Sequence, residues 1–351
     1  MKRIRLLIVV AALVFCTAAK AQNDVAIATL QHGNNVSVFK GPGALAEALT
    51  SAVNGDVITL SQGTFNAAPI TKSVSIYGMG FEENKTTGTL KSIITGNLDI
   101  GIANGSCSNI HLEGLYLDGS FYLGTSVFEQ NTSVTNLTVI KVYARKTTYI
   151  NANTDDIFFD QCILPNGFYS SPETSYKYKA SKLYLRNCYL YGQLRNFQLT
   201  DNSITLDHCI FNTPNNDGVF KDTACPITMI SSIYCNGYGA WPPAGSNMEY
   251  CLSNNNYIIS RSYNPGFNTC YTTNASAWLG IFTDNNENAT YSQTRTYELQ
   301  QPTVWVDADG KEIGIHGGNG WSKVPSTPVV KNLSITPSGT NLNVTYEAEV
   351  R

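Results

Sequence analysis

Acidic and basic residues alternate at one position of a repeated nine-residue pattern. Asp160, Arg186 and Asp207 occupy the fifth place of three consecutive copies, and His208 follows directly. If the copies stack as strands of one sheet, the two carboxylates lie about 9 to 10 Å apart, at the upper edge of the separation that an inverting glycosidase uses. We predict Asp160, Arg186 and Asp207 as candidate catalytic residues. The alternative is a ladder of opposite charges that relieve one another on a sheet surface.

A bound cation has weaker support in the sequence. Asp155, Asp156 and Asp160 are close together, and carboxylates with carbonyl oxygens are the ligands that Ca²⁺ prefers. However, Asp155 and Asp160 fall on different sides of a strand. The cysteines lack the paired spacing of a zinc site, and the four histidines are scattered singly. We predict no metal and no cofactor, with Ca²⁺ as the alternative.

Aromatic residues supply the ligand-binding candidates. The chain has 20 tyrosines and 4 tryptophans, and several of them fall in loops or at outward-facing places. Flat rings with a polar edge suit the faces and hydroxyl groups of sugars, although such rings also pack against neighbouring strands. The residues that we predict to bind glycan are Tyr176, Tyr184, Tyr238 and Trp241.

The nine-residue pattern itself indicates how these side chains are positioned. Its copies begin at Asn109, Asn136, Asp156, Lys182, Ser203, Pro226 and Asn247, and most have apolar residues at the second, fourth, seventh and ninth places. The starts differ by 27, 20, 26, 21, 23 and 21 residues, a period typical of a solenoid. Alternation with period two makes those places the core of short strands.

The repeat favours an all-β, right-handed parallel β-helix over a leucine-rich repeat. A leucine-rich repeat needs a bulky apolar residue three places before the first apolar one, where this chain has Thr154, Ala180 and Asp201. The intervals between copies also lack helical apolar periodicity. Cys162, Cys188 and Cys209 share the seventh place, so we expect a buried stack of thiols. Cys225, Cys235, Cys251 and Cys270 remain able to pair, in an order that the sequence does not fix.

The two ends of the chain differ from the repeats. Residues 1–21 have a basic start, an apolar run and a small-residue cleavage site, which predicts a signal peptide. Cys16 leaves lipoprotein processing as the alternative. Residues 22–324 form the predicted β-helix domain, in which the amphipathic segment 43–54 is a helix that caps the open end. Residues 325–351 read as a proline-rich connector and a β-hairpin.

The net charge and the predicted export of the protein limit the kinds of partner that it can bind. Removal of residues 1–21 takes away four basic residues, which leaves 19 basic against 26 acidic residues and a formal net charge of −7. A mildly acidic chain is a poor candidate for nucleic-acid binding. No later segment is apolar enough to span a membrane. We therefore expect a secreted protein of the bacterial cell surface or periplasm, of undetermined oligomeric state.

Segments near both ends suggest a family. GDVITLSQGTF (Gly55–Phe65) and ITKSVSIYGMG (Ile70–Gly80), with the helix before them, resemble secreted right-handed parallel β-helix proteins of the pectin-lyase-like superfamily. DADGKEIGIHGG (Asp307–Gly318) is similar to the last rung of many such proteins. The resemblance implies the fold but not one activity, because this fold hosts lyases, hydrolases, epimerases and binding proteins.

The catalytic residues of the family are not complete in this sequence. Residues 153–156 (NTDD) resemble the NTD element of polygalacturonase-like glycosidases, but the paired aspartates, the Gly-His element and the Arg-x-Lys element are missing. We therefore predict an exported protein that binds a polysaccharide or cell-surface glycan without a complete lyase catalytic set. One alternative is a polysaccharide lyase or glycoside hydrolase acting on acidic glycans. Another is a structural or adhesive surface protein.

Overall fold

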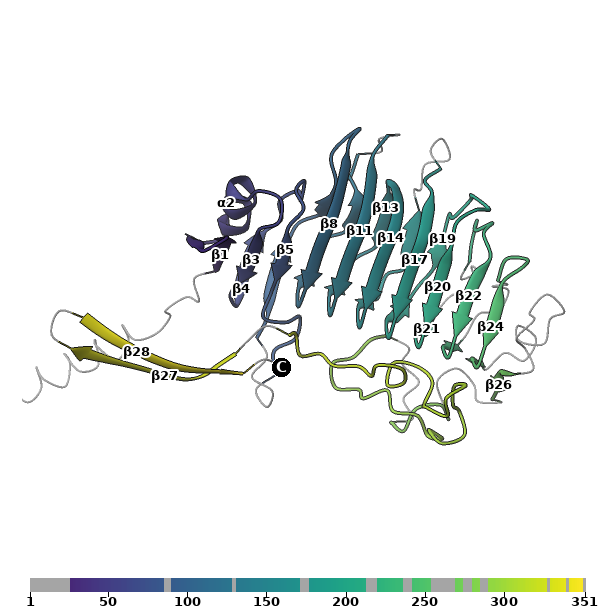
Figure 1. Ribbon diagram of the computed structural model, residues 1–351. Helices are drawn as coiled ribbons and strands as arrows, with labels where there is room; N and C mark the ends of the chain where they lie inside the picture. The colour runs from purple at the N-terminus through teal and green to yellow at the C-terminus, as the bar shows by residue number, and fades with distance from the viewer. Residues whose placement is uncertain are drawn as a thin grey trace, which may run out of the picture.

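The computed structural model shows a right-handed parallel β-helix, in which the chain winds repeatedly through three sheets (Figure 1). The structure describes residues 26–84, 90–127, 131–170, 177–212, 220–235, 242–253, 269–273, 280–284, 290–326, 329–338 and 341–349. The predicted signal peptide lies outside these ranges. None of the helices in the part of the chain that the structure describes has the length and apolar character needed to span a bilayer.

The turns of the coil contribute strands to three sheets, which we name sheets A, B and C, and within the described residues five turns have a strand in sheet C. Sheet A consists, in spatial order, of β2 (Asn35–Lys40), β1 (Ile27–His32), β3 (Val57–Leu60), β5 (Ser75–Tyr77), β8 (Ser106–Glu113), β11 (Ser133–Ile140), β14 (Asn153–Asp160), β17 (Ala180–Arg186), β20 (Ile204–Asp207), β22 (Ile227–Ile230) and β24 (Asn247–Glu249). Sheet B consists of β4 (Gly63–Asn66), β6 (Ser92–Thr95), β9 (Tyr116–Leu117), β12 (Tyr143–Ala144), β15 (Ile163–Leu164), β18 (Tyr189–Tyr191), β21 (Ile210–Asn212), β23 (Ile233–Cys235), β25 (Leu252–Ser253) and β26 (Tyr271–Thr272). Sheet C consists of β7 (Leu98–Ile100), β10 (Phe121–Gly124), β13 (Thr148–Asn151), β16 (Phe168–Ser170) and β19 (Leu194–Arg195).

The nine-residue pattern spans the corner between sheets A and B. Its second and fourth places lie in sheet A and its seventh and ninth places in or beside sheet B, and these side chains are buried inside the coil, as predicted. At the corner itself, the sixth place of every copy has a left-handed backbone, from φ 48° at Ser231 to φ 68° at Gly114. Such a conformation is costly for most residues. It is repeated here because the chain must bend there in each turn.

The predicted start of the last copy is wrong by two residues. Met248 pairs with Met229 in the parallel register between β22 and β24, so this copy begins at Gly245 and not at Asn247. The corrected register puts Cys251 at the seventh place. Gly245 also has a left-handed φ of 83°, as do the first residues of four earlier copies, which are Asn109, Asn136, Asp156 and Lys182.

The N-terminal end is closed by the predicted helix and by a hairpin that the sequence did not predict. Helix α2 (Ala44–Ser51) buries Ala44, Leu45, Ala48 and Leu49, which are part of the main core. Strands β1 and β2 form an antiparallel hairpin, and β1 also pairs antiparallel with β3. The parallel part of sheet A therefore ends at β3, and the antiparallel hairpin of β1 and β2 covers its edge.

The C-terminal part of the domain covers the outside of the coil. Residues 281–321 contribute apolar side chains to a second core, which packs on outward residues of sheet B such as Ile163, Tyr189 and Ile233. This arrangement corrects the prediction that residues 307–318 form a last rung. They belong instead to a segment, residues 305–326, that runs back along the corner between sheets A and B (Figure 1). We call this segment the strap.

The strap is fastened to the left-handed corner residues of successive turns. The amide of Gly314 donates to the carbonyl of Ser231 at 2.7 Å. The Asn187 side chain donates to the carbonyls of Ile315 and Gly317, at 2.9 and 2.8 Å. Further along, the amide of Ser322 donates to Gln161 Oε1 at 2.7 Å. The side chains and the carbonyl that protrude at the corner are therefore the groups that hold the strap.

The C-terminal segment contains an antiparallel hairpin of β27 (Val329–Ser338) and β28 (Asn341–Glu349). This agrees with the hairpin predicted for the C-terminal segment. The side chains of the hairpin lie outside the described residues.

The predicted thiol stack is present inside the corner. Cys162, Cys188 and Cys209 are completely buried thiols. The Cys209 thiol donates to the carbonyl of Leu185 in the preceding turn at 3.4 Å, and Ser232 makes the same contact in the next turn, to Leu206, at 3.3 Å. From the copy that begins at Asp156 onward, the seventh place therefore holds a small side chain that donates to a carbonyl of the preceding turn. The first two copies have Leu115 and Val142 there. Burial raises the pKa of Cys188 and Cys209 well above the usual value, so both thiols stay protonated.

The pairing that the sequence left open among the other cysteines is not present in the described residues. Cys225 and Cys251 are buried thiols, and Cys270 is a half-buried thiol. The side chain of Cys235 lies outside the described residues.

Substitutions at Cys209 test the seventh-place contact. We expect Cys209→Ser to retain the donor, as Ser232 does, and to destabilise the fold less than Cys209→Ala, which leaves the Leu185 carbonyl without that partner. The difference should be about 1 kcal/mol in the free energy of unfolding, measured by urea denaturation followed by circular dichroism. If the alanine variant is as stable as the serine variant, the thiol serves only to fill space.

Candidate functional site

The predicted charge ladder is present on the outer face of sheet A. Asp160 pairs in register with Arg186, and Arg186 with Asp207. Arg186 binds Asp160 through two nitrogens, with Nε to Oδ1 at 3.1 Å and Nη2 to Oδ2 at 2.8 Å. Its guanidinium also lies 4.9 Å from the centre of the Phe158 ring. The hydrogen bond to Asp160 raises the pKa of Arg186 above its usual value.

Tyr184 extends this cluster toward Asp207. Its ring stacks on Phe158 from the preceding turn, with centroids 5.5 Å apart and an angle of 17° between the ring planes. Its hydroxyl donates to Asp207 Oδ2. Burial and this bond to a carboxylate raise the pKa of Tyr184, so the phenol is neutral and acts as a donor.

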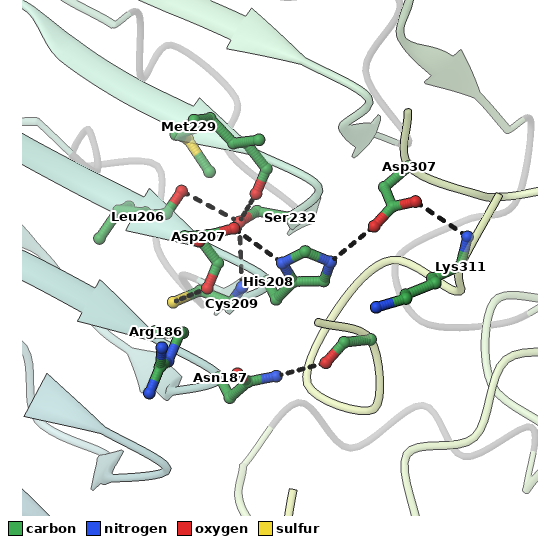
Figure 2. Close-up of polar contacts among 12 residues, drawn as sticks. Arg186, Asn187, Leu206, Asp207, His208, Cys209, Met229, Ser232, Asp307 and Lys311 are labelled. Carbon is green, nitrogen blue, oxygen red and sulfur yellow. Dashed lines mark hydrogen bonds and ion pairs between the residues drawn. The ribbon is translucent and has the colours of Figure 1, made fainter. Parts of the chain in front are cut away.

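His208 joins the cluster to the strap, as Figure 2 shows. Its Nδ1 lies 2.7 Å from Asp207 Oδ1, and its Nε2 lies 3.3 Å from Asp307 Oδ2 of the strap. The His208 side chain is only 9% exposed. The glycine-rich turn of the strap packs on its ring, because a Cβ atom added to Gly317 would lie 2.5 Å from His208 Cδ2. The imidazole is thus enclosed between two carboxylates and a glycine backbone.

The Asp207 carboxylate is held in its charged form by these partners. Burial alone would raise the pKa of Asp207, but the hydrogen bonds from His208 and Tyr184 outweigh it and hold the pKa below the usual value. Both carboxylates of the predicted catalytic pair are therefore already bonded, Asp160 to Arg186 and Asp207 to Tyr184 and His208. In this arrangement the cluster fastens the strap to the coil. A catalytic role for Asp160, Arg186 and Asp207 remains a prediction.

The far end of the same outward column anchors the end of the strap. Glu113 Oε1 accepts from the amide of Ser326 at 2.7 Å, and Glu113 Oε2 lies 3.2 Å from His111 Nε2. The Glu113 side chain is buried. Burial raises the pKa of Glu113, but the bonds from His111 and Ser326 outweigh it and lower the pKa to about 2.

The aspartates considered for calcium have other partners. Lys182 Nζ lies 3.0 Å from Asp156 Oδ1 and 3.9 Å from Asp155 Oδ1, and Asp160 binds Arg186. Within the described ranges, no group of three or more histidine, cysteine, aspartate or glutamate side chains converges in a way that would hold a metal ion.

Of the four predicted ligand-binding aromatics, only Tyr184 can be placed. Tyr176, Tyr238 and Trp241 lie outside the described residues. The structure instead brings together Tyr122, Tyr149 and Tyr169 on the outer face of sheet C, where they pair in register in three adjacent strands. We call these three residues the tyrosine strip. Each member is half-buried.

The rings of the tyrosine strip contact one another along the axis of the coil. Tyr122 and Tyr149 are stacked, with centroids 4.9 Å apart and an angle of 12°. Tyr149 and Tyr169 meet edge to face at 6.0 Å. Asp99 pairs with Tyr122 at one end, and Arg195 pairs with Tyr169 at the other, with its guanidinium 6.0 Å from the ring centre.

A signal for the tyrosine strip exists in the sequence. Tyr122, Tyr149, Tyr169 and Arg195 follow one another at intervals of 27, 20 and 26 residues, which equal the first three intervals between the nine-residue copies. These residues thus stand at a constant distance after the start of each copy. The polar stretches between the copies vary in length, so the sequence predicts a third strand and loops there but does not fix the register of that strand.

Comparison with known proteins gives no relative. No protein-family model matches the chain, and no curated protein or solved structure is significantly similar to it.

A pH series on Glu113→Gln tests the anchor of the strap. A carboxyl group whose folded-state pKa is depressed stabilises the fold above its unfolded pKa, and this contribution is lost as the pH falls through the folded value. A shift from 4.5 to about 2 corresponds to about 3 kcal/mol. We expect the variant to be less stable than the parent by up to that amount at pH 7 and by progressively less between pH 4.5 and 2, as measured by urea unfolding.

Glu249→Gln is the matched control for this series. Glu249 stands in the same outward column, but its carboxylate accepts from Asn247 in its own strand, at 2.6 Å, and not from the strap. Because Glu249 makes no hydrogen bond with the strap among the described residues, we expect this variant to lose less stability than Glu113→Gln at pH 7. An equal loss in both variants at pH 7 would show that the Ser326 contact is not what makes Glu113 important.

Proposed function

We propose that this chain is an exported carbohydrate-binding β-helix protein whose binding surface is the tyrosine strip on sheet C. The observation that carries the proposal is the in-register placement of Tyr122, Tyr149 and Tyr169 on an outward face. Their side chains stay partly exposed. The outward rings of sheet B, such as Tyr116, Tyr143 and Tyr189, instead pack with the C-terminal region in the second core. Half-buried tyrosines present an apolar ring and a polar hydroxyl together, which suits the surface of a sugar.

The spacing of the strip supports an extended glycan chain as the ligand. Adjacent strands lie about 4.7–4.9 Å apart, which is close to the length of one pyranose unit in an extended polysaccharide. A glycan laid along the axis of the coil would therefore meet an equivalent side chain at each turn. The rigid strands hold the rings in place before binding, so little side-chain freedom is lost on association.

The ends of the strip carry opposite charges. Arg195 lies beyond Tyr169, and its Nε is 3.8 Å from Asp222 Oδ2, a distance that leaves its guanidinium able to bind a carboxylate. At the other end, Asp99 Oδ2 accepts from the amide and hydroxyl of Ser126, at 2.8 and 2.9 Å. A sugar acid is thus favoured at the Arg195 end and a neutral sugar at the Asp99 end.

The enzymatic alternative has less support. An acid or base catalyst must reach the substrate with an available proton or lone pair. Asp207 is bonded to Tyr184 and His208, and the strap encloses the His208 ring. A lyase or hydrolase acting through Asp160, Arg186 and Asp207 would require the strap to move away first.

Binding measurements on strip variants test the proposal. We would screen the parent by affinity electrophoresis in polygalacturonate and in a neutral β-glucan, and then titrate oligosaccharides of the retained polymer by calorimetry. We expect Tyr149→Ala to weaken binding about tenfold, or about 1.4 kcal/mol, because it removes the central ring. Arg195→Gln should weaken binding of the acidic polymer only.

Tyr77→Ala is the matched control. Tyr77 is also a half-buried, outward tyrosine in contact with a neighbouring ring, that of His111, with centroids 5.0 Å apart, but it stands on sheet A. This variant should bind as the parent does. If neither polymer slows the migration of the parent protein, the result counts against the proposal and favours a structural or adhesive role. Loss of binding in Tyr184→Ala but not in Tyr149→Ala would move the site to sheet A.

A further inference from the structure

Two cysteines at the end of the thiol stack differ from the rest. Cys251 and Cys270 occupy equivalent places in adjacent turns, because Leu252 and Tyr271, which follow them, pair in register. The amide of Tyr271 donates to the carbonyl of Cys251 at 2.8 Å. Their α-carbons are therefore about one strand spacing apart, about 4.8 Å. This lies inside the range of about 4.4–6.8 Å that a disulfide requires.

The two side chains already contact one another. The two sulfur atoms are in hydrogen-bonding contact, and Cys270 Sγ also donates to the carbonyl of Met248 at 3.2 Å. Cys251 is completely buried, but Cys270 is only half-buried, whereas Cys162, Cys188 and Cys209 are all enclosed. A reagent from solvent can thus reach this pair through Cys270 and cannot reach the inner thiols without unfolding.

The chemistry of the pair is asymmetric. The hydrogen bond with Cys251 outweighs burial and lowers the pKa of Cys270, whereas burial raises the pKa of Cys251 well above its usual value. The thiolate is the species that attacks a disulfide. Cys270 is therefore the attacking sulfur and Cys251 the resolving one.

We propose that Cys251 and Cys270 are an oxidisable dithiol that closes into a disulfide between adjacent turns by exchange with an external disulfide. The Cys270 thiolate attacks one sulfur of the external disulfide, forms a mixed disulfide and releases one thiolate. Cys251 then loses its proton and attacks the Cys270 sulfur, which releases the second thiolate. The protein loses two electrons and two protons, and the external disulfide is reduced to two thiols.

The disulfide would join two adjacent turns covalently at the C-terminal end of the described coil. A disulfide restricts the unfolded chain and so favours the folded one. The last turns of a solenoid have a neighbour on one side only, which makes them the turns that fray first. This proposal does not depend on glycan binding, but it fits an exported chain, because disulfides persist in oxidising compartments.

Oxidation of the full chain with oxidised glutathione tests the inference. In the reduced protein, brief treatment with a maleimide should label Cys270 before any thiol of the inner stack. After oxidation, the remaining thiols are alkylated and the chain is digested without reduction. We expect a cross-linked peptide containing Cys251 and Cys270, a higher Tm, and reversal of both by dithiothreitol.

Serine variants provide the controls. Cys270→Ser keeps a small donor at the seventh place, as Ser232 does, and should abolish both the cross-link and the response of Tm to the oxidant. Cys209→Ser should leave both unchanged. The proposal is overturned if Cys270 stops at the glutathione adduct, if the cross-link involves another cysteine, or if the maleimide labels inner thiols as fast as Cys270. The labelling order is measured on the parent chain, so it stands even if a variant fails to fold.

Discussion

In-register hydrogen bonding between successive turns is the constraint on which the rest of this structure depends. Because each strand pairs with its equivalent one turn later, any place of the repeat becomes a column of side chains about 4.8 Å apart. The apolar core, the thiol stack, the charge ladder and the tyrosine strip are four such columns. Each has the same geometry, and only the residue type decides whether a column packs, pairs charges or faces solvent.

The left-handed backbone at the corner between sheets A and B is unfavourable, and hydrogen bonds from the C-terminal segment help to offset its cost. All seven corner residues are left-handed, and only one of them, Gly114, is a glycine. Their side chains and carbonyls protrude from the coil, where Gln161, Asn187 and Ser231 receive or supply the hydrogen bonds of the strap. His208 contributes an ionic contact, with its Nε2 at 3.3 Å from Asp307 Oδ2. Of the three residues predicted to be catalytic, Asp207 contributes to this attachment. Asp207 orients His208, and His208 meets Asp307 across the junction.

Two outer faces of the coil therefore have different roles. The faces beside the A–B corner are occupied by the strap and by the second core. Sheet C retains a partly exposed aromatic column with a cation at one end and a carboxylate at the other. A ligand needs a surface that the protein itself has not already covered. For this reason the tyrosine strip is the better candidate for recognition, although the charge ladder contains more chemically active groups.

Much of the β-helix and of its side-chain columns was predictable from the sequence, because periodicity is a local property of the chain. The spacing of apolar residues determined the β-helix, the inward cysteines, the column of Asp160, Arg186 and Asp207, and the capping helix. The register of the last copy was not predictable in this way, since Met248 fits the apolar pattern in two frames, at the second place or at the fourth. Only strand pairing with β22 chose between them.

The tertiary structure decided what lies against each column. Residues 307–318 read as a further rung, yet they bind corner side chains of turns more than a hundred residues earlier, such as Asn187. No local pattern records such a contact, because its partners come together only after the coil has formed. The sequence by itself determined which side chains would stack. Folding of the C-terminal segment over the coil determined which of those stacks are enclosed and which remain open to a ligand.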